Sequence, residues 1–341
     1  MTDKFYRVVQ TATILVFCVL LSAASFAADK LPPEKAGEIG EPTGQIAFIR
    51  NGNIWVINAD GTSPQLVTEV TNADGRLSWS PDNRRIIFPR SGKVSLQGPD
   101  PMVGGFHKVY DLFIAYLDSA YNNNTMWWTR ITEDLGSRGP EWNEDGNEII
   151  FYKDMNANIA NAGSPNYQIC TIAPDGSDFT VLRKDWQNFG DDFLINPSLS
   201  PDGKIAAVSM YDMKPQGMLI FDRANPMIPI DSIRAWTMKN LKKVAPSWSP
   251  DGKWLAYVFN DMNNPGIYVT TPDLSEEYLV FKPPVGTMLY NLPPSWSPDG
   301  KWLTFATIDG SVWVSAITGE RARRVTPPGL DKNPAWSKGT E

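Results

Sequence analysis

One ten-residue string occurs twice in this chain, and it restricts the possible folds more than any other feature of the sequence. The string PSWSPDGKWL occupies residues 246–255 and recurs at 294–303. Four looser copies follow the same pattern and begin at Leu77, Pro140, Pro197 and Pro334. The steps between the central Trp or Leu residues of successive copies are 63, 57, 49, 48 and 40 residues. Periods of about 40 to 50 residues are typical of propeller blades built from four strands.

Each copy predicts a strand, a tight turn and a second strand. In the S-P-D-G segment, proline fixes φ at the second position of the turn, aspartate bonds to its own backbone, and glycine adopts the positive φ that closes the hairpin. Asn83 replaces this glycine in the first copy, and asparagine tolerates the same conformation. An apolar strand follows each turn, and a third and a fourth strand follow it, as at 266–270 and 278–281.

Counting these strands predicts an all-β fold, a six-bladed β-propeller of four-stranded blades over residues 45–341. Residues 45–68 supply three strands with no copy of the repeat before them, and the copy at 334–339 supplies one strand with nothing after it. Pairing of this C-terminal strand with the N-terminal strands would complete one blade and close the ring. Hydrophobic residues make up 42% of the chain, and we expect the central tryptophans to fill the core between blades.

The first 44 residues are predicted to be an export signal followed by a linker. Lys4 and Arg7 precede an apolar run, and the small residues that follow suit cleavage after residue 27, so we predict a secretory signal peptide over 1–27. The alternative, an uncleaved anchor, is disfavoured because the apolar stretch is shorter than the roughly 20 residues that span a membrane. Residues 28–44 are rich in Pro, Gly and charge, which predicts a solvated linker. The expected location is periplasmic or secreted, with no stable membrane insertion after cleavage.

Cysteine usage agrees with this assignment. Cleavage would remove Cys18 and leave Cys170 alone, which excludes an intramolecular disulfide. We expect Cys170 to be a small buried apolar residue on a strand.

Composition and missing motifs exclude several functions. The 31 basic and 38 acidic residues give a net charge of -7, which argues against nucleic acid as a partner. His107 is the single histidine, so most histidine-based metal, triad and relay chemistry is disfavoured. The sequence contains no C-x-x-C pair, H-E-x-x-H motif or G-x-S-x-G elbow. We therefore predict no catalytic residues.

Loop lengths predict which face of the propeller binds. The tight turns fall on one face, which we call the turn face, and the long variable connections fall on the other, the loop-rich face. The long connections are 90–108, 153–166, 184–195, 222–245 and 282–292. Because binding commonly uses variable loops on a rigid scaffold, we place the functional surface on the loop-rich face.

Two groups of residues on that face are candidate binding residues. The first recurs after equivalent strands and comprises Asp154, Asn156, Asp212, Asp261, Asn263 and Asp309. These oxygen ligands would hold a hard cation such as calcium at the channel mouth; alternatively, each aspartate bonds to the amides of its own loop. The second group is an acidic and aromatic patch suited to peptides or sugars, and it comprises Trp186, Asp191 and Asp192; alternatively, it is a solvated loop whose aromatic residues pack inward. His107, in the inserted loop of the second blade, is a separate candidate at the channel mouth, with an incidental surface histidine as the alternative.

The repeat resembles that of the TolB family of exported bacterial proteins. The shared pattern is P-x-W-S-P-D-G-K-x-L together with N-A-D-G-T at 58–62, and it covers about residues 45–337. The resemblance implies a WD-repeat-like propeller that binds envelope proteins without a cofactor. In TolB the propeller follows a separate α/β domain, whereas residues 29–44 stand in that place here. Similar repeats occur in prolyl-oligopeptidase-like peptidases and oligogalacturonate lyases, whose nucleophile elbow and histidine-rich site this sequence lacks.

Two functions remain open on the sequence alone. The first is a non-catalytic, monomeric scaffold that binds a protein, such as an envelope protein, through the loop-rich face. The second is a metal-assisted lyase or hydrolase that acts on an oligosaccharide or peptide with the loop aspartates.

Overall fold

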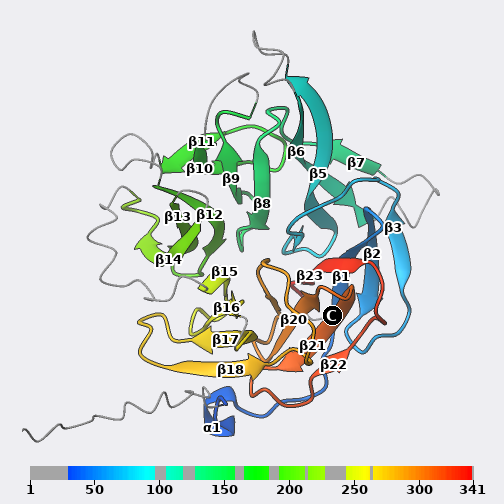
Figure 1. Cartoon of the computed structure of the whole chain (residues 1–341), viewed down its shortest axis with the longest axis vertical. Helices are drawn as coiled ribbons and strands as arrows, with labels where there is room; N and C mark the ends of the chain where they lie inside the picture. The colour runs from blue at the N-terminus through cyan, green and yellow to red at the C-terminus, as the bar shows by residue number, and fades with distance from the viewer. Residues whose placement is uncertain are drawn as a thin grey trace, which may run out of the picture.

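The fold is a ring of β-sheets around a central axis (Figure 1). The computed structural model describes residues 30–96, 105–117, 127–157, 165–183, 192–211, 214–226, 243–261 and 264–339. A single-turn helix, α1 (Pro33–Ala36), lies beside the ring. In the described ranges, no helix has the length and apolar character needed to cross a membrane.

Each sheet is one blade of a six-bladed β-propeller, and its strands follow one another from the centre outward. Blade 1 contains β23 (Asp331–Trp336), β1 (Gln45–Arg50), β2 (Asn53–Asn58) and β3 (Gln65–Thr68). Blade 2 contains β4 (Ser78–Trp79), β5 (Arg85–Leu96), β6 (Gly105–Tyr116) and β7 (Trp127–Arg130). Blade 3 contains β8 (Ser137–Trp142), β9 (Ile149–Asp154), β10 (Tyr167–Ile172) and β11 (Thr180–Arg183).

The other three blades follow the same antiparallel order. Blade 4 contains β12 (Asp192–Leu199), β13 (Lys204–Tyr211) and β14 (Lys214–Asp222), and the segment that could hold a fourth strand lies outside the described residues. Blade 5 contains β15 (Lys243–Trp248), β16 (Leu255–Phe259), β17 (Gly266–Thr270) and β18 (Glu277–Phe281). Blade 6 contains β19 (Ser295–Trp296), β20 (Trp302–Thr307), β21 (Ser311–Ala316) and β22 (Arg323–Arg324).

The two ends of the described chain close the ring, as the strand count predicted. In blade 1, β23 pairs antiparallel with β1, and Trp336 lies opposite Ile46. Arg50 makes a bidentate ion pair with the buried Asp331, with Nε and Nη2 at 2.6 and 2.7 Å from the two carboxylate oxygens. Six blades and closure by the C-terminal strand are therefore confirmed.

The repeat forms its turn through one network of side-chain and backbone bonds. Ser249 Oγ donates to Asp251 at 2.7 Å and accepts the backbone N–H of Trp254 at 2.9 Å. Gly252 has a φ of 68°, a left-handed conformation that glycine adopts without strain. This network starts the second strand of the blade in register.

The central tryptophans lie between blades and join them. Trp79 is 1% exposed, and its indole N–H donates to the carbonyl of Ala335 in blade 1 at 3.0 Å. The indole N–H of Trp296 reaches the carbonyl of Ser247 in blade 5 at 2.9 Å. The expectation that these residues form the core is confirmed.

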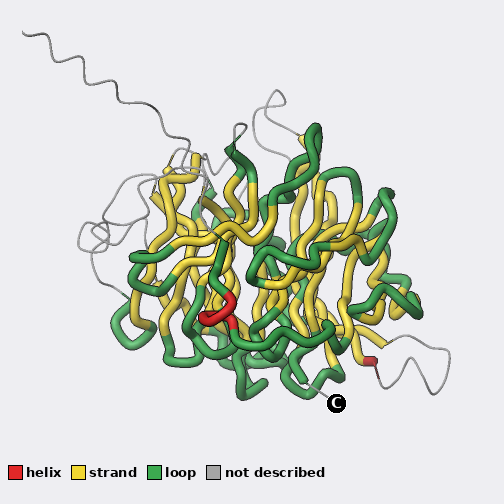
Figure 2. The backbone as a smooth tube through the Cα atoms, turned by 90° about the horizontal axis from the view of Figure 1, so that it is seen from below, coloured by secondary structure: helices red, strands yellow, loops and turns green. Residues whose placement is uncertain are grey.

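Two expectations from the sequence differ from the structure. Much of the predicted loop 90–108 is a long hairpin, because β5 and β6 stay paired from Arg85 and Tyr116 to Leu96 and Gly105. Residues 30–44, predicted as a solvated linker, are largely exposed but do not hang free, because they follow the outside of blades 5 and 6 (Figure 1, Figure 2).

The contacts of residues 30–44 explain this second difference. Leu31 is buried in the hydrophobic cluster of blade 5, and Lys35 pairs with Glu276 at 2.5 Å. Arg321 donates to the carbonyls of Ile39 and Gly40 at 3.2 and 3.0 Å. An apolar residue and backbone carbonyls thus dock a segment whose composition alone indicated a linker.

Candidate functional site

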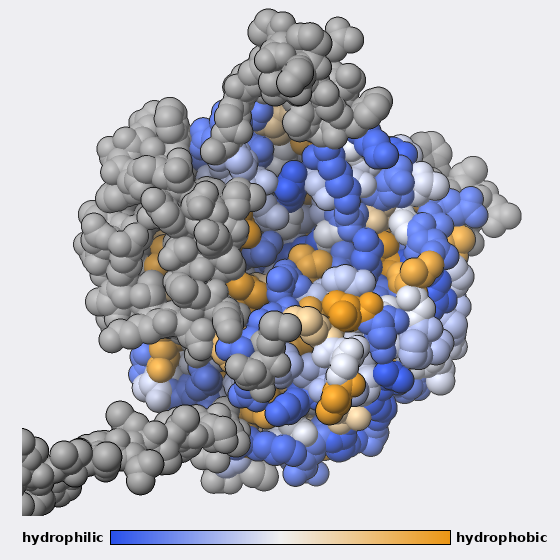
Figure 3. Space-filling model, in the orientation of Figure 1, coloured by the Kyte–Doolittle hydropathy of each residue, from blue (hydrophilic) through white to orange (hydrophobic). Residues whose placement is uncertain are grey.

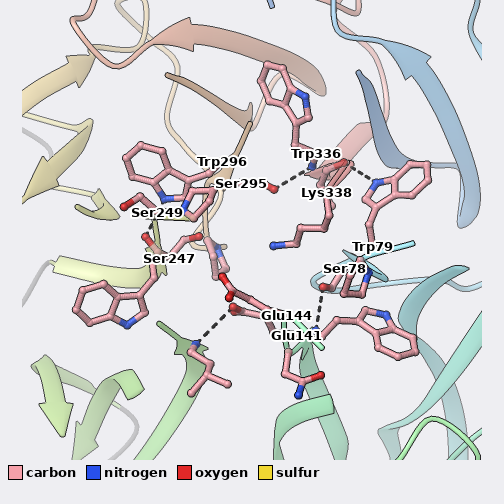
Figure 4. Close-up of a pocket in the computed structure, with 18 of the residues that line it drawn as sticks. Ser78, Trp79, Glu141, Glu144, Ser247, Ser249, Ser295, Trp296, Trp336 and Lys338 are labelled. Carbon is pink, nitrogen blue, oxygen red and sulfur yellow. Dashed lines mark hydrogen bonds between the residues drawn. The ribbon is translucent and has the colours of Figure 1, made fainter. Parts of the chain in front are cut away.

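A pocket of about 500 Å³ opens at the centre of the turn face (Figure 4). All six blades line it, because each contributes residues of its repeat copy. Proline, serine and charged side chains line it, and behind them lie five buried tryptophans, Trp79, Trp142, Trp248, Trp296 and Trp336. Loop lengths had directed the prediction to the opposite face, so this site was not predicted from the sequence.

The rim of the pocket is formed by the proline position of the S-P-D-G turns. Four blades keep the proline, as Pro81, Pro201, Pro250 and Pro298. A Cβ added at Gly146 would meet Pro81 at 3.3 Å, and one at Gly252 would meet Pro201 at 3.5 Å. The prolines therefore pack on the glycine of the next turn, which is a structural role.

Blades 3 and 1 depart from this pattern and place charges on the rim. Glu144 stands in the proline position of blade 3, and Lys338 stands in that of blade 1. The glycine that follows Glu144 around the ring, Gly203, has open space where a Cβ would lie. Turn packing therefore does not explain Glu144.

A second ring, deeper in the pocket, is formed by the residue before each central Trp or Leu. Ser78 Oγ accepts the backbone N–H of Trp142 in the next blade at 3.1 Å, and Ser295 Oγ accepts that of Trp336 at 2.9 Å. Glu141 occupies this serine position in blade 3 and accepts the backbone N–H of Leu199 at 3.4 Å. Each side chain thus links two neighbouring blades.

Glu141 also pairs with an arginine that lies further down the channel. Arg76 Nη2 bonds to Glu141 Oε2, and its Nη1 donates to the carbonyl of Pro197 at 2.8 Å. The two side chains are 11% and 10% exposed. Arg76 lies two residues before β4, an inner strand that runs toward the turn face, so this pair forms the floor of the pocket.

Lys338 supplies a positive charge to the pocket. Its backbone N–H is fixed by Asn83 Oδ1 at 2.7 Å, and its side chain points into the pocket toward Glu141 and Glu144 (Figure 4). Within the described residues, its ammonium group makes no hydrogen bond or ion pair. The surrounding protein desolvates this group and lowers the pKa of Lys338, which Glu141 raises in part.

On the loop-rich face, the described aspartates bond to their own loops. Asp154 Oδ1 accepts the backbone N–H groups of Asn156 and Asn166 at 3.0 and 2.9 Å. Asp309 accepts from Thr307 Oγ1 at 2.6 Å and pairs with Arg324 at 3.0 Å. These contacts match the alternative in which each aspartate orders its loop.

For the other candidate residues, the structure gives only their position in the chain's elements or does not describe them. Asp261 follows blade 5's second strand, and its carbonyl accepts the N–H of Asn264 at 3.1 Å. Asp192 begins β12 and His107 lies in β6. Asp212, Asn263, Trp186 and Asp191 lie outside the described residues. Among the residues described, no group of three or more His, Cys, Asp or Glu side chains could hold a metal ion, and the cation site stays a prediction.

The loop-rich face carries exposed aliphatic residues over blade 6. Val285, Ile308 and Leu330 are 107%, 52% and 67% exposed; we call them the blade-6 patch. Their loops are joined by backbone bonds, from Ile308 N–H to Met288 O at 2.9 Å and from Gly329 N–H to Asp309 O at 3.0 Å. Figure 3 shows hydrophobic side chains interrupting the largely hydrophilic described surface on this face.

The chain is similar to known proteins mainly in structure. No protein-family model matches it. An uncharacterised protein of Agrobacterium fabrum is 25% identical over 217 residues, so the match covers 60% of this chain and 61% of that relative.

Three solved structures share the fold. TolB from Acinetobacter baumannii gives a TM-score of 0.65 at 18% identity, over 89% of this chain and 69% of TolB. A putative TolB from Agrobacterium tumefaciens gives 0.56 at 13% identity, over 84% and 90%. The tricorn protease gives 0.57 at 14% identity, over 86% and 26%. The resemblance to TolB propellers that the repeat predicted is confirmed for the fold.

Proposed function

We propose that the protein is an exported, non-catalytic propeller that binds a protein partner through its loop-rich face. The blade-6 patch is the observation that carries this proposal. Its three exposed aliphatic side chains lie on loops that backbone hydrogen bonds hold next to one another, and exposed apolar patches mark interaction sites.

The charge pattern around the patch supports a protein as the ligand. Residues 283–298 contain no charged side chain, and neither do residues 325–330. The cores of protein interfaces are depleted in charge and rich in apolar contact. The charged residue next to Ile308, Asp309, is paired with Arg324.

Export is supported by residues 1–27, which read as a signal peptide. The likeness to TolB structures supports a periplasmic location in the same way. Detection of the mature chain in a periplasmic extract, with cleavage after residue 27, is the expected result. A chain that stays in the membrane fraction with residues 1–27 attached would contradict export as a cleaved protein.

The binding face is tested by photo-crosslinking in cells. A photoreactive amino acid at position 308 or 330 is expected to give a discrete crosslinked protein, and the same group at Phe179 is the matched control. Phe179 is also exposed, at 43%, but lies at the turn between β10 and β11. Crosslinks that are equal at positions 308 and 179, or absent at 308 and 330, would overturn the proposal.

A further inference from the structure

The hairpin of β5 and β6 extends beyond the other strands of its blade. The inner strand β4 pairs only with Ile86 and Ile87 of β5, and the outer strand β7 pairs only with residues 113–116 of β6. β5 and β6 stay paired with each other to Leu96 and Gly105, toward the loop-rich face. We call residues 92–96 and 105–109 the blade-2 ribbon, and it extends past the rim of the ring (Figure 1).

The blade-2 ribbon has two strands and no third within the described residues. The last bond on the far side of β5 runs from the N–H of Ser91 to the carbonyl of Asn72 at 2.9 Å. The last bond on the far side of β6 runs from the N–H of Tyr110 to the carbonyl of Leu135, also at 2.9 Å. A two-stranded ribbon is marginally stable in water, and a third strand stabilises it.

The backbone of β5 presents unpaired groups along this ribbon. Because the N–H of Ser91 points away from β6 and the direction alternates along an antiparallel strand, the N–H and C=O groups of Lys93 and Ser95 also point away from β6. In the part of the chain that the structure describes, no group bonds to them. A strand edge of this kind is a template for pairing with another chain.

The β5 edge is the more open of the ribbon's two edges. Gly92 and Lys93 of β5 are exposed, whereas Val109, which lies opposite Gly92 on β6, is only 5% exposed. The protein therefore covers the ribbon from the side of β6 and leaves the side of β5 accessible to a partner.

The charges of the ribbon indicate the chemistry of that partner. Lys93 and Lys108 lie opposite each other, and residues 92–96 and 105–109 contain no aspartate or glutamate. Lys108 pairs with Asp74, but Lys93 makes no ion pair within the described residues. A second copy of the chain would bring another edge with lysine and no acid. A strand with an acidic residue opposite Lys93 would neutralise it, and cross-strand pairs of opposite charge are favourable.

We propose that a partner protein adds an extended strand to the free edge of β5, with an acidic residue opposite Lys93. The inference rests on the proposed function, because it specifies how a partner of the loop-rich face binds. Hydrogen bonds to the backbone of Lys93 and Ser95 provide affinity and the ion pair provides register, as in other peptide recognition by strand addition.

The test is photo-crosslinking in cells from a photoreactive amino acid at position 95 of the full chain, in backgrounds that differ at position 93. Lys93→Pro removes the outward N–H and leaves the β5–β6 bonds, since proline is tolerated where the N–H of an edge strand faces solvent. We expect the yield of the discrete crosslinked protein to fall tenfold or more. Lys93→Ala is the matched control, because it keeps the N–H, and a loss of only two- to threefold is expected.

Two further variants keep the N–H and test the charge. Lys93→Arg is expected to match the parent, and Lys93→Glu is expected to give a lower yield than Lys93→Ala because it repels the acidic strand. Mass spectrometry of the crosslinked peptide should identify a partner segment that contains aspartate or glutamate. Equal yields for Lys93→Ala and Lys93→Glu would contradict the acidic strand even if Lys93→Pro disturbed the hairpin, which thermal unfolding would reveal.

The outcomes separate this inference from the proposed function. Equal yields in the parent and Lys93→Pro, or no crosslink at position 95 while position 308 gives one, would overturn strand addition and leave the proposed function standing. A crosslink at position 95 that Lys93→Pro abolishes, with none at 308 and 330, would support strand addition and contradict the blade-6 patch as the binding surface.

Discussion

At the scale of single residues, environment separates structural groups from reactive ones. A thiol and a carboxylate can both react or bind a ligand. Cys170, however, is buried, and the carboxylate of Asp154 accepts hydrogen bonds from the backbone N–H groups of its own loop. Lys338 differs from both because its charge is left without a partner in the described residues.

Cys170 is expected to be inert in the folded protein. Burial raises the pKa of its thiol from 9.0 to about 12, and only the thiolate reacts. The thiolate population near neutral pH is therefore about a thousandfold smaller than for a free cysteine. In a Cys18→Ser chain, a disulfide reagent such as DTNB should react slowly without denaturant and stoichiometrically with it. Fast reaction of the folded chain would show that Cys170 is accessible.

Asp154 is expected to stabilise its loop without a metal ion. Replacing it by alanine leaves two backbone N–H groups without their acceptor, which costs about 1 to 3 kcal/mol. Chemical denaturation should show this loss equally with calcium and with a chelator. A stabilisation of the parent protein by calcium that Asp154→Ala abolishes would instead support the cation site and revive the lyase or hydrolase.

At the scale of strands and turns, the repeat made the fold predictable because its turn residues mark both ends of a strand. The strand β17 has the predicted bounds, 266–270, since turn signals flank it. The strand predicted at 278–281 is β18, which begins one residue earlier, at Glu277. The hairpin of β5 and β6 was read as a loop because its polar and glycine-rich sequence carries no alternating apolar pattern.

The candidate site was harder to predict, for a physical reason. The strand pattern follows from what the repeat copies share, whereas the pocket depends on where two copies differ. Glu144 and Lys338 could have been found by aligning the copies position by position and asking which side chains the turn does not need. The pairing of Arg76 with Glu141 could not have been found from such an alignment, because it depends on how three blades meet in space.

Aspartates in the outer turns of the blades predict that the folded protein loses stability in acid. Hydrogen bonds from Thr271 and Ser275 hold the pKa of Asp273 at about 2, and bonds from Thr62 and Ser177 lower the pKa values of Asp60 and Asp175 below 3.8. The unfolded chain therefore takes up protons first as pH falls, so the stability that these carboxylates contribute is complete above about pH 4 and is lost toward pH 2.

This dependence is measurable by thermal unfolding between pH 5 and 2. The Tm difference between the parent and Asp273→Asn should shrink as pH falls below 3.8. Glu320→Gln is the control, because the Glu320 side chain makes no hydrogen bond within the described ranges. A Tm difference for Asp273→Asn that does not change with pH would contradict the role given to this turn.

At the scale of the whole molecule, ring closure positions the turn-face pocket and the blade-6 patch. Pairing of β23 with β1 brings Lys338 to the pocket that Glu144 also lines, and the loop that leads into β23 carries Leu330 of the blade-6 patch. A ring that opened at this point would lose the pocket and separate the patch from its neighbouring loops.

Engineered disulfide formation tests this closure most directly. Ala47 lies opposite Ala335 across the β1–β23 pair, so a chain with cysteines at both positions and Cys18→Ser should form a disulfide on mild oxidation. The linked peptides are identified by mass spectrometry, and pairing of position 47 with Ala316→Cys in β21 of blade 6 is the control. A closed ring predicts a 47–335 link in monomeric protein and none between 47 and 316. Free thiols at 47 and 335, or a link that forms only between molecules, would contradict it.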